Sequence, residues 1–144
     1  MVCFSRKVFI VGIFSLSMLV CIGCGDQHRL KGKVTFADGQ PVTSGMVIFS
    51  NASFQARGEI QSDGNYTVSS TGKNDGIPKG EYKVTVSGIV KLVGGGKNPM
   101  PFPVPLCDEK YMNVDTTDLS CTVPVSRNTF DIILEPHPTN YEGS

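Results

Sequence analysis

Two of the five cysteines stand three residues apart, a spacing that can serve metal binding or redox chemistry. Cys21 and Cys24 form this C-x-x-C at the end of a long apolar run. Zinc sites built on such pairs normally contain a second cysteine pair or closely spaced histidines. The chain has two histidines, His28 and His137, which lie far apart. The other cysteines are Cys3, Cys107 and Cys121. No second pair exists, and the sequence predicts no metal site and no cofactor.

The residues around this pair have the layout of a secretory signal instead. Arg6 and Lys7 supply positive charge, and residues 8–22 contain no charged side chain. This apolar run is about 15 residues long, shorter than the ~20 that span a bilayer as a helix. A cytosolic redox C-x-x-C is disfavoured because Cys21 is embedded in the apolar run and no βαβ pattern surrounds it.

The stretch before Cys24 resembles a bacterial lipobox. Gly23 fits the position before the modified cysteine and Ile22 the position before that, while Cys21 stands where leucine is usual. The resemblance implies a signal peptide at residues 1–23, lipid attachment to Cys24 and a short tether at 24–28. Several acyl chains at about 0.8 kcal/mol per buried CH₂ make such an anchor stable. An uncleaved membrane anchor and a secretory signal cut elsewhere are the alternatives.

A lipid-anchored chain would lie in the cell envelope, facing the periplasm or the exterior. In that oxidising compartment Cys107 and Cys121 can form a disulfide, which would close a loop worth about 3 kcal/mol. The alternative is two unpaired thiols. The sequence leaves both the disulfide and the unpaired thiols open.

Charge and length exclude several classes of protein. The chain has 144 residues, enough for one domain, and 13 basic residues balance 13 acidic ones. A nucleic-acid partner is not expected, because binders of that class carry a basic excess. Neither a G-x-S-x-G elbow nor a phosphate-binding G-x-x-x-x-G-K-[ST] occurs, and the sequence predicts no catalytic residue.

After the tether, polar and apolar residues alternate, and apolar residues do not recur at the three- and four-residue spacing of an amphipathic helix. Alternation is typical of strands with one buried face. The predicted strands are residues 29–36, 45–50, 56–61, 66–69, 81–87, 119–123 and 128–135. They predict an all-β fold, a seven-stranded antiparallel β-sandwich over residues 29–135, followed by a C-terminal tail at 136–144.

The order of three motifs in this domain carries a family resemblance. They are G-K-V-T-F-A-D-G-Q-P-V-T-S-G-M-V-I-F, S-D-G-N-Y-T-V and I-P-K-G-E-Y-K-V-T-V. Together they resemble the carboxypeptidase regulatory-like, or transthyretin-like, β-sandwich. The later E-K-Y, L-S-C-T-V and N-T-F-D-I-I-L resemble its small lipoprotein version in planctomycete-type bacteria. The resemblance implies a prealbumin-like fold and a non-catalytic accessory or adhesion-like module.

The segment 90–109 is rich in glycine and proline and is predicted to be a loop. Prolines at every second position favour an extended backbone and are expected to prevent ladder pairing. Met100, Phe102 and Val104 alternate with these prolines and are the candidate contact residues for a partner. The alternative is a variable loop that folds over an edge of the sandwich.

Two further functions have to be weighed. The C-terminus Y-E-G-S is similar to the Y-R-G-S of hydroxyisourate hydrolases, but Glu142 replaces the arginine and the last strand holds no histidine. A carbohydrate- or polymer-binding module is the runner-up, which the sequence favours less because such sites usually display aromatic platforms and the chain has no tryptophan. We therefore expect a non-enzymatic protein whose partners are a membrane, through the lipid anchor, and an envelope protein or glycan.

Overall fold

A computed structural model of the protein describes residues 26–72, 75–95 and 98–138. The expected signal peptide at 1–23, the expected lipidation site Cys24 and the end of the C-terminal tail lie outside these residues. The described chain is all-β, as the alternation predicts, and its only helices are two short 3-10 turns.

Strands follow one another closely along the described chain. The first six are β1 (Gln27–His28), β2 (Lys31–Phe36), β3 (Met46–Ser50), β4 (Gln55–Glu59), β5 (Asn65–Thr67) and β6 (Ile77–Pro78). The others are β7 (Gly80–Ser87), β8 (Val90–Gly95), β9 (Asn98–Pro105), β10 (Ser120–Val123) and β11 (Ile132–Leu134). The 3-10 turns are η1 (Glu109–Met112) and η2 (Ser126–Asn128).

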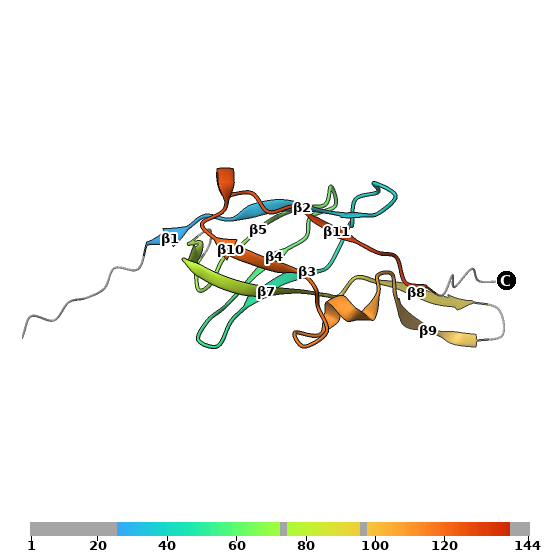
Figure 1. Ribbon diagram of the computed structural model, residues 1–144. Coiled ribbons are helices and arrows are strands. Elements are labelled where there is room, and N and C mark those ends of the chain that lie inside the picture. The colour runs from blue at the N-terminus through green and yellow to red at the C-terminus, as the bar shows by residue number, and fades with distance from the viewer. Residues whose placement is uncertain (1–25, 73–74, 96–97, 139–144) are drawn as a thin grey trace, which may run out of the picture.

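Two sheets enclose the core. One has the strand order β10-β7-β3-β4 and the other the order β11-β2-β5. Figure 1 shows them as two layers, with β2 and β11 above β3 and β7. At one edge the layers are joined, because Arg57 of β4 exchanges two backbone hydrogen bonds with Ser69, which follows β5. Two small pairs, β1-β6 and β8-β9, lie outside these sheets.

The alternation in the sequence places the strands of both sheets. β7 buries Tyr82, Val84 and Val86, as the alternation predicts. β3, apolar on both faces, is a central strand that lies between β7 and β4. β2, β3, β4, β5, β7, β10 and β11 all overlap the predicted strands. The alternation does not predict β1, β6, β8 and β9, which pair with one another outside the two main sheets.

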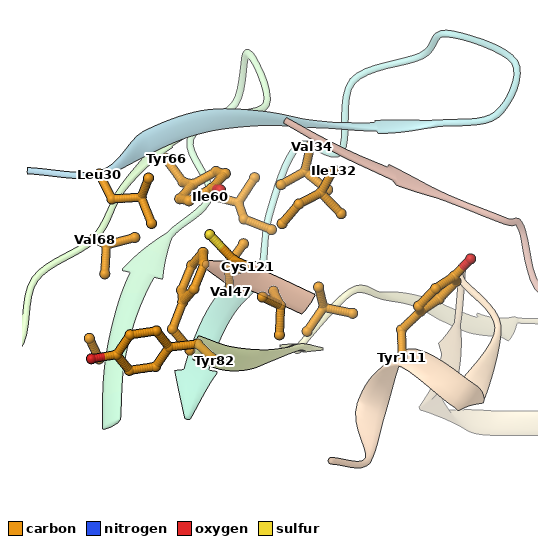
Figure 2. Close-up of a cluster of buried hydrophobic side chains, with 14 of the residues drawn as sticks. Leu30, Val34, Val47, Ile60, Tyr66, Val68, Tyr82, Tyr111, Cys121 and Ile132 are labelled. Carbon is orange, nitrogen blue, oxygen red and sulfur yellow. The ribbon is translucent and has the colours of Figure 1, made fainter. Parts of the chain in front are cut away.

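The core lies between the two layers and contains aromatic and β-branched side chains. Tyr66 from one sheet and Phe49 from the other are both almost fully buried, with ring centroids 6.2 Å apart. Figure 2 shows Tyr66, Val34 and Ile132 above the side chains that rise from the lower sheet. Each large buried apolar side chain contributes about 1.5–3 kcal/mol. This shared core holds the two sheets face to face.

One pairing differs from the antiparallel prediction. β11 runs parallel to β2, with Ile132 opposite Val34 and Leu134 opposite Phe36. A tight hairpin forces its two strands to be antiparallel, but no hairpin joins these two strands. The chain reaches β11 from β10 in the opposite sheet, through a connection that contains η2. The direction of β11 is therefore set by packing and not by a turn.

Gly32 allows the two outer neighbours of β2 to approach it closely. A Cβ added at Gly32 would overlap the Phe130 carbonyl oxygen and lie 2.9 Å from Cε1 of Tyr66. The Tyr66 hydroxyl donates a hydrogen bond to that same carbonyl. Only glycine at position 32 leaves room for this contact between β5 and the segment that leads into β11.

The first prediction tests this close approach. Gly32→Ala should lower the free energy of unfolding by about 1–3 kcal/mol through overpacking. Gly72→Ala is the matched control, because a Cβ there meets its nearest atom, Oδ2 of Asp75, at an ordinary 3.6 Å. Urea unfolding of both variants measures the difference. Equal stability of the two variants would contradict the packing described.

Candidate functional site

The β8–β9 hairpin extends beyond the sandwich at one end of the molecule. Its strands pair antiparallel, from Val90 opposite Pro105 to Gly95 opposite Asn98. Figure 1 shows it at the end opposite β1, where the described chain begins. The predicted loop is therefore wrong for most of this segment, which forms a two-stranded ribbon.

The prolines of β9 do not prevent pairing because they all fall on one side of the strand. Successive residues of a strand direct their backbone groups to opposite sides. Pro101, Pro103 and Pro105 occupy alternate positions of β9, so their backbone nitrogens all point to the same side of the strand. Phe102 and Val104 occupy the positions between them and stand opposite Val93 and Lys91. The missing N–H groups are those directed away from β8, which also makes the outer edge of β9 a poor template for another strand.

The hairpin exposes large apolar side chains. Leu92 is 65% exposed, Met100 79% and Phe102 45%, and Val90 and Leu106 are also exposed. The register places Val90 and Leu92 on one face of the ribbon and Phe102 on the other, because Leu92 stands opposite Pro103. Isolated exposed apolar residues are ordinary, but a ribbon that exposes apolar side chains on both faces is typical of an interaction surface. We call the exposed side chains of Val90, Leu92, Met100, Phe102 and Leu106 the hairpin surface.

The sequence prediction for this surface is correct for the exposure of two residues and wrong for one. Met100 and Phe102 are exposed, whereas Val104 is only 4% exposed and cannot contact a partner. Val104 has the same phase as Phe102, but it lies nearer the base of the ribbon, where the domain covers it. Leu92 was missed because the prolines concealed the strand pairing that forms the ribbon. It stands opposite Pro103, on the face of the ribbon that Phe102 does not occupy.

Backbone hydrogen bonds attach the base of the hairpin to the sandwich. The Leu106 N–H donates to the Ile89 carbonyl, and the His137 N–H donates to the Leu106 carbonyl. Two residues after Leu106, the Asp108 N–H donates to the Glu135 carbonyl. The chain that follows β11 thus holds the hairpin base on one side, which fixes the direction in which the ribbon leaves the domain.

A charged cluster supports the same base. Nζ of Lys110 on η1 lies 3.2 Å from Oδ2 of Asp118 and 3.0 Å from Oε2 of Glu135. It also stands 4.7 Å from the ring centroid of Tyr111. The two carboxylates raise the pKa of Lys110 well above its usual range. The cluster therefore stays charged and ties η1 to the chain after β11.

Cys107 and Cys121 are buried free thiols, so the disulfide left open by the sequence is not formed in the structure. Cys121 stands opposite Tyr82, and the chain next to Cys107 bonds to Ile89. Tyr82 and Ile89 are seven residues apart (89 − 82), which corresponds to roughly 20 Å along an extended chain. A disulfide requires Cα atoms within about 7 Å. The two cysteines lie near opposite ends of this segment.

The two histidines of the described residues do not lie together. His28 pairs with Ile77 at the β1 end, whereas the His137 backbone bonds to Leu106 at the hairpin base. Asp75 has a pKa well below the ordinary value because the N–H groups of Ser70, Gly72 and Thr71 donate to it. That carboxylate closes a surface turn and is not directed at a cleft.

The described residues also lack two other features. Within 26–72, 75–95 and 98–138, no three His, Cys, Asp or Glu side chains gather as metal ligands. In that same part of the chain, no helix has the length and apolar character needed to cross a membrane. The apolar run at residues 8–22 lies outside it.

Comparison with known proteins gives no match. No family model matches the chain, and neither a curated protein nor a solved structure is similar to it.

A second prediction concerns the two thiols. Burial raises the pKa of both Cys107 and Cys121 to about 11, so neither should react with an alkylating reagent in the native state at neutral pH. In urea both should react. The chain from Asp26 onward contains only these two cysteines, and mass spectrometry after alkylation counts the labels. Absence of labelling in urea, with labelling restored by a reductant, would show a bridge and contradict the structure.

Proposed function

We propose that the protein is a lipid-anchored cell-envelope protein that presents a non-catalytic β-sandwich for binding or scaffolding. The observation that carries this proposal is the position of the hairpin surface. It lies at one end of the domain, and β1, the first described strand, lies at the other end. A module attached at one end and apolar at the other is suited to hold a partner away from the membrane.

The proposed lipidation site, Cys24, lies close to β1 in the sequence. Cys24 precedes the first residue of β1, Gln27, by three positions (27 − 24). Three residues span at most about 11 Å, so a lipid on Cys24 would keep the β1 end close to the membrane. The anchored domain would then direct its hairpin outward.

The hairpin combines exposed apolar side chains with an absence of acidic residues. Between Glu81 and Asp108 the chain contains no acidic residue, and its charged residues there are Lys83, Lys91 and Lys97. An apolar surface of this kind fits a partner with an apolar patch and an acidic rim. The fixed base lowers the entropic cost of binding, because the ribbon is held in place before the partner arrives.

Two observations support the absence of catalysis in this proposal. His28 and His137, the candidates for a general base, lie at opposite ends of the domain. A general base must come within hydrogen-bond reach of the group it deprotonates, with a cleft around them. The most strongly perturbed carboxylate, Asp75, is engaged by its own turn.

The finer fold assignment belongs to this proposal as well. The two main sheets divide their strands into four and three, and the chain passes between them repeatedly. We take this arrangement as support for a seven-stranded, transthyretin-like sandwich, to which the small pairs β1-β6 and β8-β9 are additions. On that basis the hairpin is the feature that distinguishes this chain from a plain sandwich.

A third prediction tests the anchor. The full chain, expressed in a bacterium that processes lipoproteins, should be recovered from membranes with a mass equal to residues 24–144 plus acyl groups. Cys24→Ser should abolish both cleavage and acylation, because the serine lacks the sulfur that accepts lipid. Cys21→Ser is the matched control and should be processed normally. An unmodified wild-type chain that begins at Met1 would contradict the proposal.

A fourth prediction tests the hairpin surface. Leu92 on the hairpin and Ile133 on the sandwich are both 65% exposed, which makes them a matched pair. A photo-crosslinking residue placed at position 92 in the anchored chain should capture a discrete envelope component. The same residue at position 133 should not. Equal capture at the two positions would show that the hairpin has no special role in binding.

A further inference from the structure

A hollow in the surface at the β1 end of the domain is lined by positive charge. It has a volume of about 370 Å³ and lies where β2 begins, beside β5 and η2. Its lining residues are Arg29, Leu30, Lys31, Thr67, Arg127 and Asn128. Three of these are cations and none is a carboxylate. We call this feature the basic hollow.

The cations of the basic hollow are not neutralised by ion pairs. Both ion pairs of the described residues belong to Lys110, far along the chain from this site. An adjacent hollow shares Lys31 and Thr67 and adds Lys33 and Asp131. Oδ1 of Asp131 accepts a hydrogen bond from the Lys33 backbone, 2.9 Å away, and is thus already engaged. The basic hollow itself therefore contains three cations and no carboxylate.

This local excess of positive charge runs against the charge of the domain as a whole. From Cys24 onward the chain has 11 basic residues (13 − 2, without Arg6 and Lys7) and 13 acidic ones. The net charge of this part is −2 (11 − 13). A concentration of cations at one end of a negatively charged domain marks that end for an anionic partner.

Arg127 has a backbone conformation that arginine adopts only at a cost, which indicates a role for its side chain. Arg127 has φ 59° and Asn128 has φ 54°, both in the left-handed region. Glycine, or asparagine as at 128, adopts this conformation with little strain, whereas arginine does so at a cost. The turn itself would be better served by glycine at position 127. The arginine adds a guanidinium at the mouth of the basic hollow.

We propose that the basic hollow binds the phosphate group of an anionic membrane lipid, an inference that rests on the lipid anchoring proposed above. Guanidinium and ammonium groups are the usual protein ligands of phosphate. Arg29 follows Cys24 by five residues (29 − 24), so it lies at most about 18 Å from the lipidated residue. Anchoring at Cys24 would therefore bring the hollow to the headgroup layer.

The binding of a headgroup would add a second attachment to the acyl chains. A lipid chain on a tether leaves the domain free to rotate, whereas a phosphate held beside η2 fixes one end of the sandwich against the membrane. The hairpin surface would then be held away from the bilayer and remain open to its partner. The inference thus assigns the orientation of the anchored domain to Arg29, Lys31 and Arg127.

The test uses the chain from Asp26 onward, which carries the whole described core, because its buried apolar residues lie between Leu30 and Leu134. Co-sedimentation compares vesicles of phosphatidylcholine with vesicles of phosphatidylcholine and phosphatidylglycerol in equal parts. The chain should bind the second and not the first. Arg127→Gly should weaken that binding about fivefold, as expected for one cation near a charged surface. This variant should fold normally, since glycine suits the positive φ.

Lys91→Gln provides the matched control, because it removes one positive charge at the opposite end of the domain. It should leave vesicle binding nearly unchanged. Equal losses for Lys91→Gln and Arg127→Gly would overturn the proposal in favour of diffuse electrostatic attraction. Equal binding of the wild-type chain to the two kinds of vesicle would also overturn it.

A final arm separates the headgroup from a free anion. Inorganic phosphate is titrated while the amide signals of Arg29, Lys31 and Arg127 are followed by NMR. Shifts of these signals without any vesicle binding would overturn the membrane assignment and identify a free-anion site. Because this chain lacks Cys24, its vesicle binding does not depend on lipidation. The intact mass of the full chain tests the lipid anchor, and vesicle binding of the chain from Asp26 onward tests the basic hollow separately.

Discussion

The parallel pairing of β2 with β11 is the contact on which the rest of the structure depends. It joins the first long strand to the last in one sheet. At its beginning the Phe130 N–H donates to the Lys31 carbonyl, beside the basic hollow. Beyond its other end, the chain from Glu135 to His137 holds the hairpin base. A single pair of strands therefore connects the two ends of the domain and sets them roughly 25 Å apart.

Sequence reasoning predicted the body of the domain because one face of each strand is buried. Alternation at positions such as Tyr82, Val84 and Val86 follows directly from that burial, and it fixes both the strand and its inner face. It could not give the direction of β11, because no turn links β11 to β2. It also could not place Cys107 relative to Cys121, since their separation depends on the pairing of distant strands.

The candidate site was harder to predict than the core. Proline normally argues against a strand, and four prolines in alternation concealed the fact that a strand can lose donors on one side only. Exposure at Met100 and Phe102 was within reach of the sequence, whereas the burial of Val104 depends on where the ribbon meets the domain. The basic hollow has a weak sequence signal, since Arg127 is about a hundred residues from Arg29 and Lys31 and is brought to them by the entry into β11.

Together these features describe a domain with two chemically different ends, one lined by cations and one with exposed apolar side chains. We propose that the basic end lies near the lipid and that the apolar end faces away. The most direct test of this account is the depth of each end in a nanodisc that contains the lipidated chain and paramagnetic lipid headgroups. The account predicts broadened amide signals at Arg29, Lys31 and Arg127 and sharp signals at Leu92 and Phe102. Broadening confined to Leu92 and Phe102 would contradict it, because the hairpin would then be the end that meets the membrane.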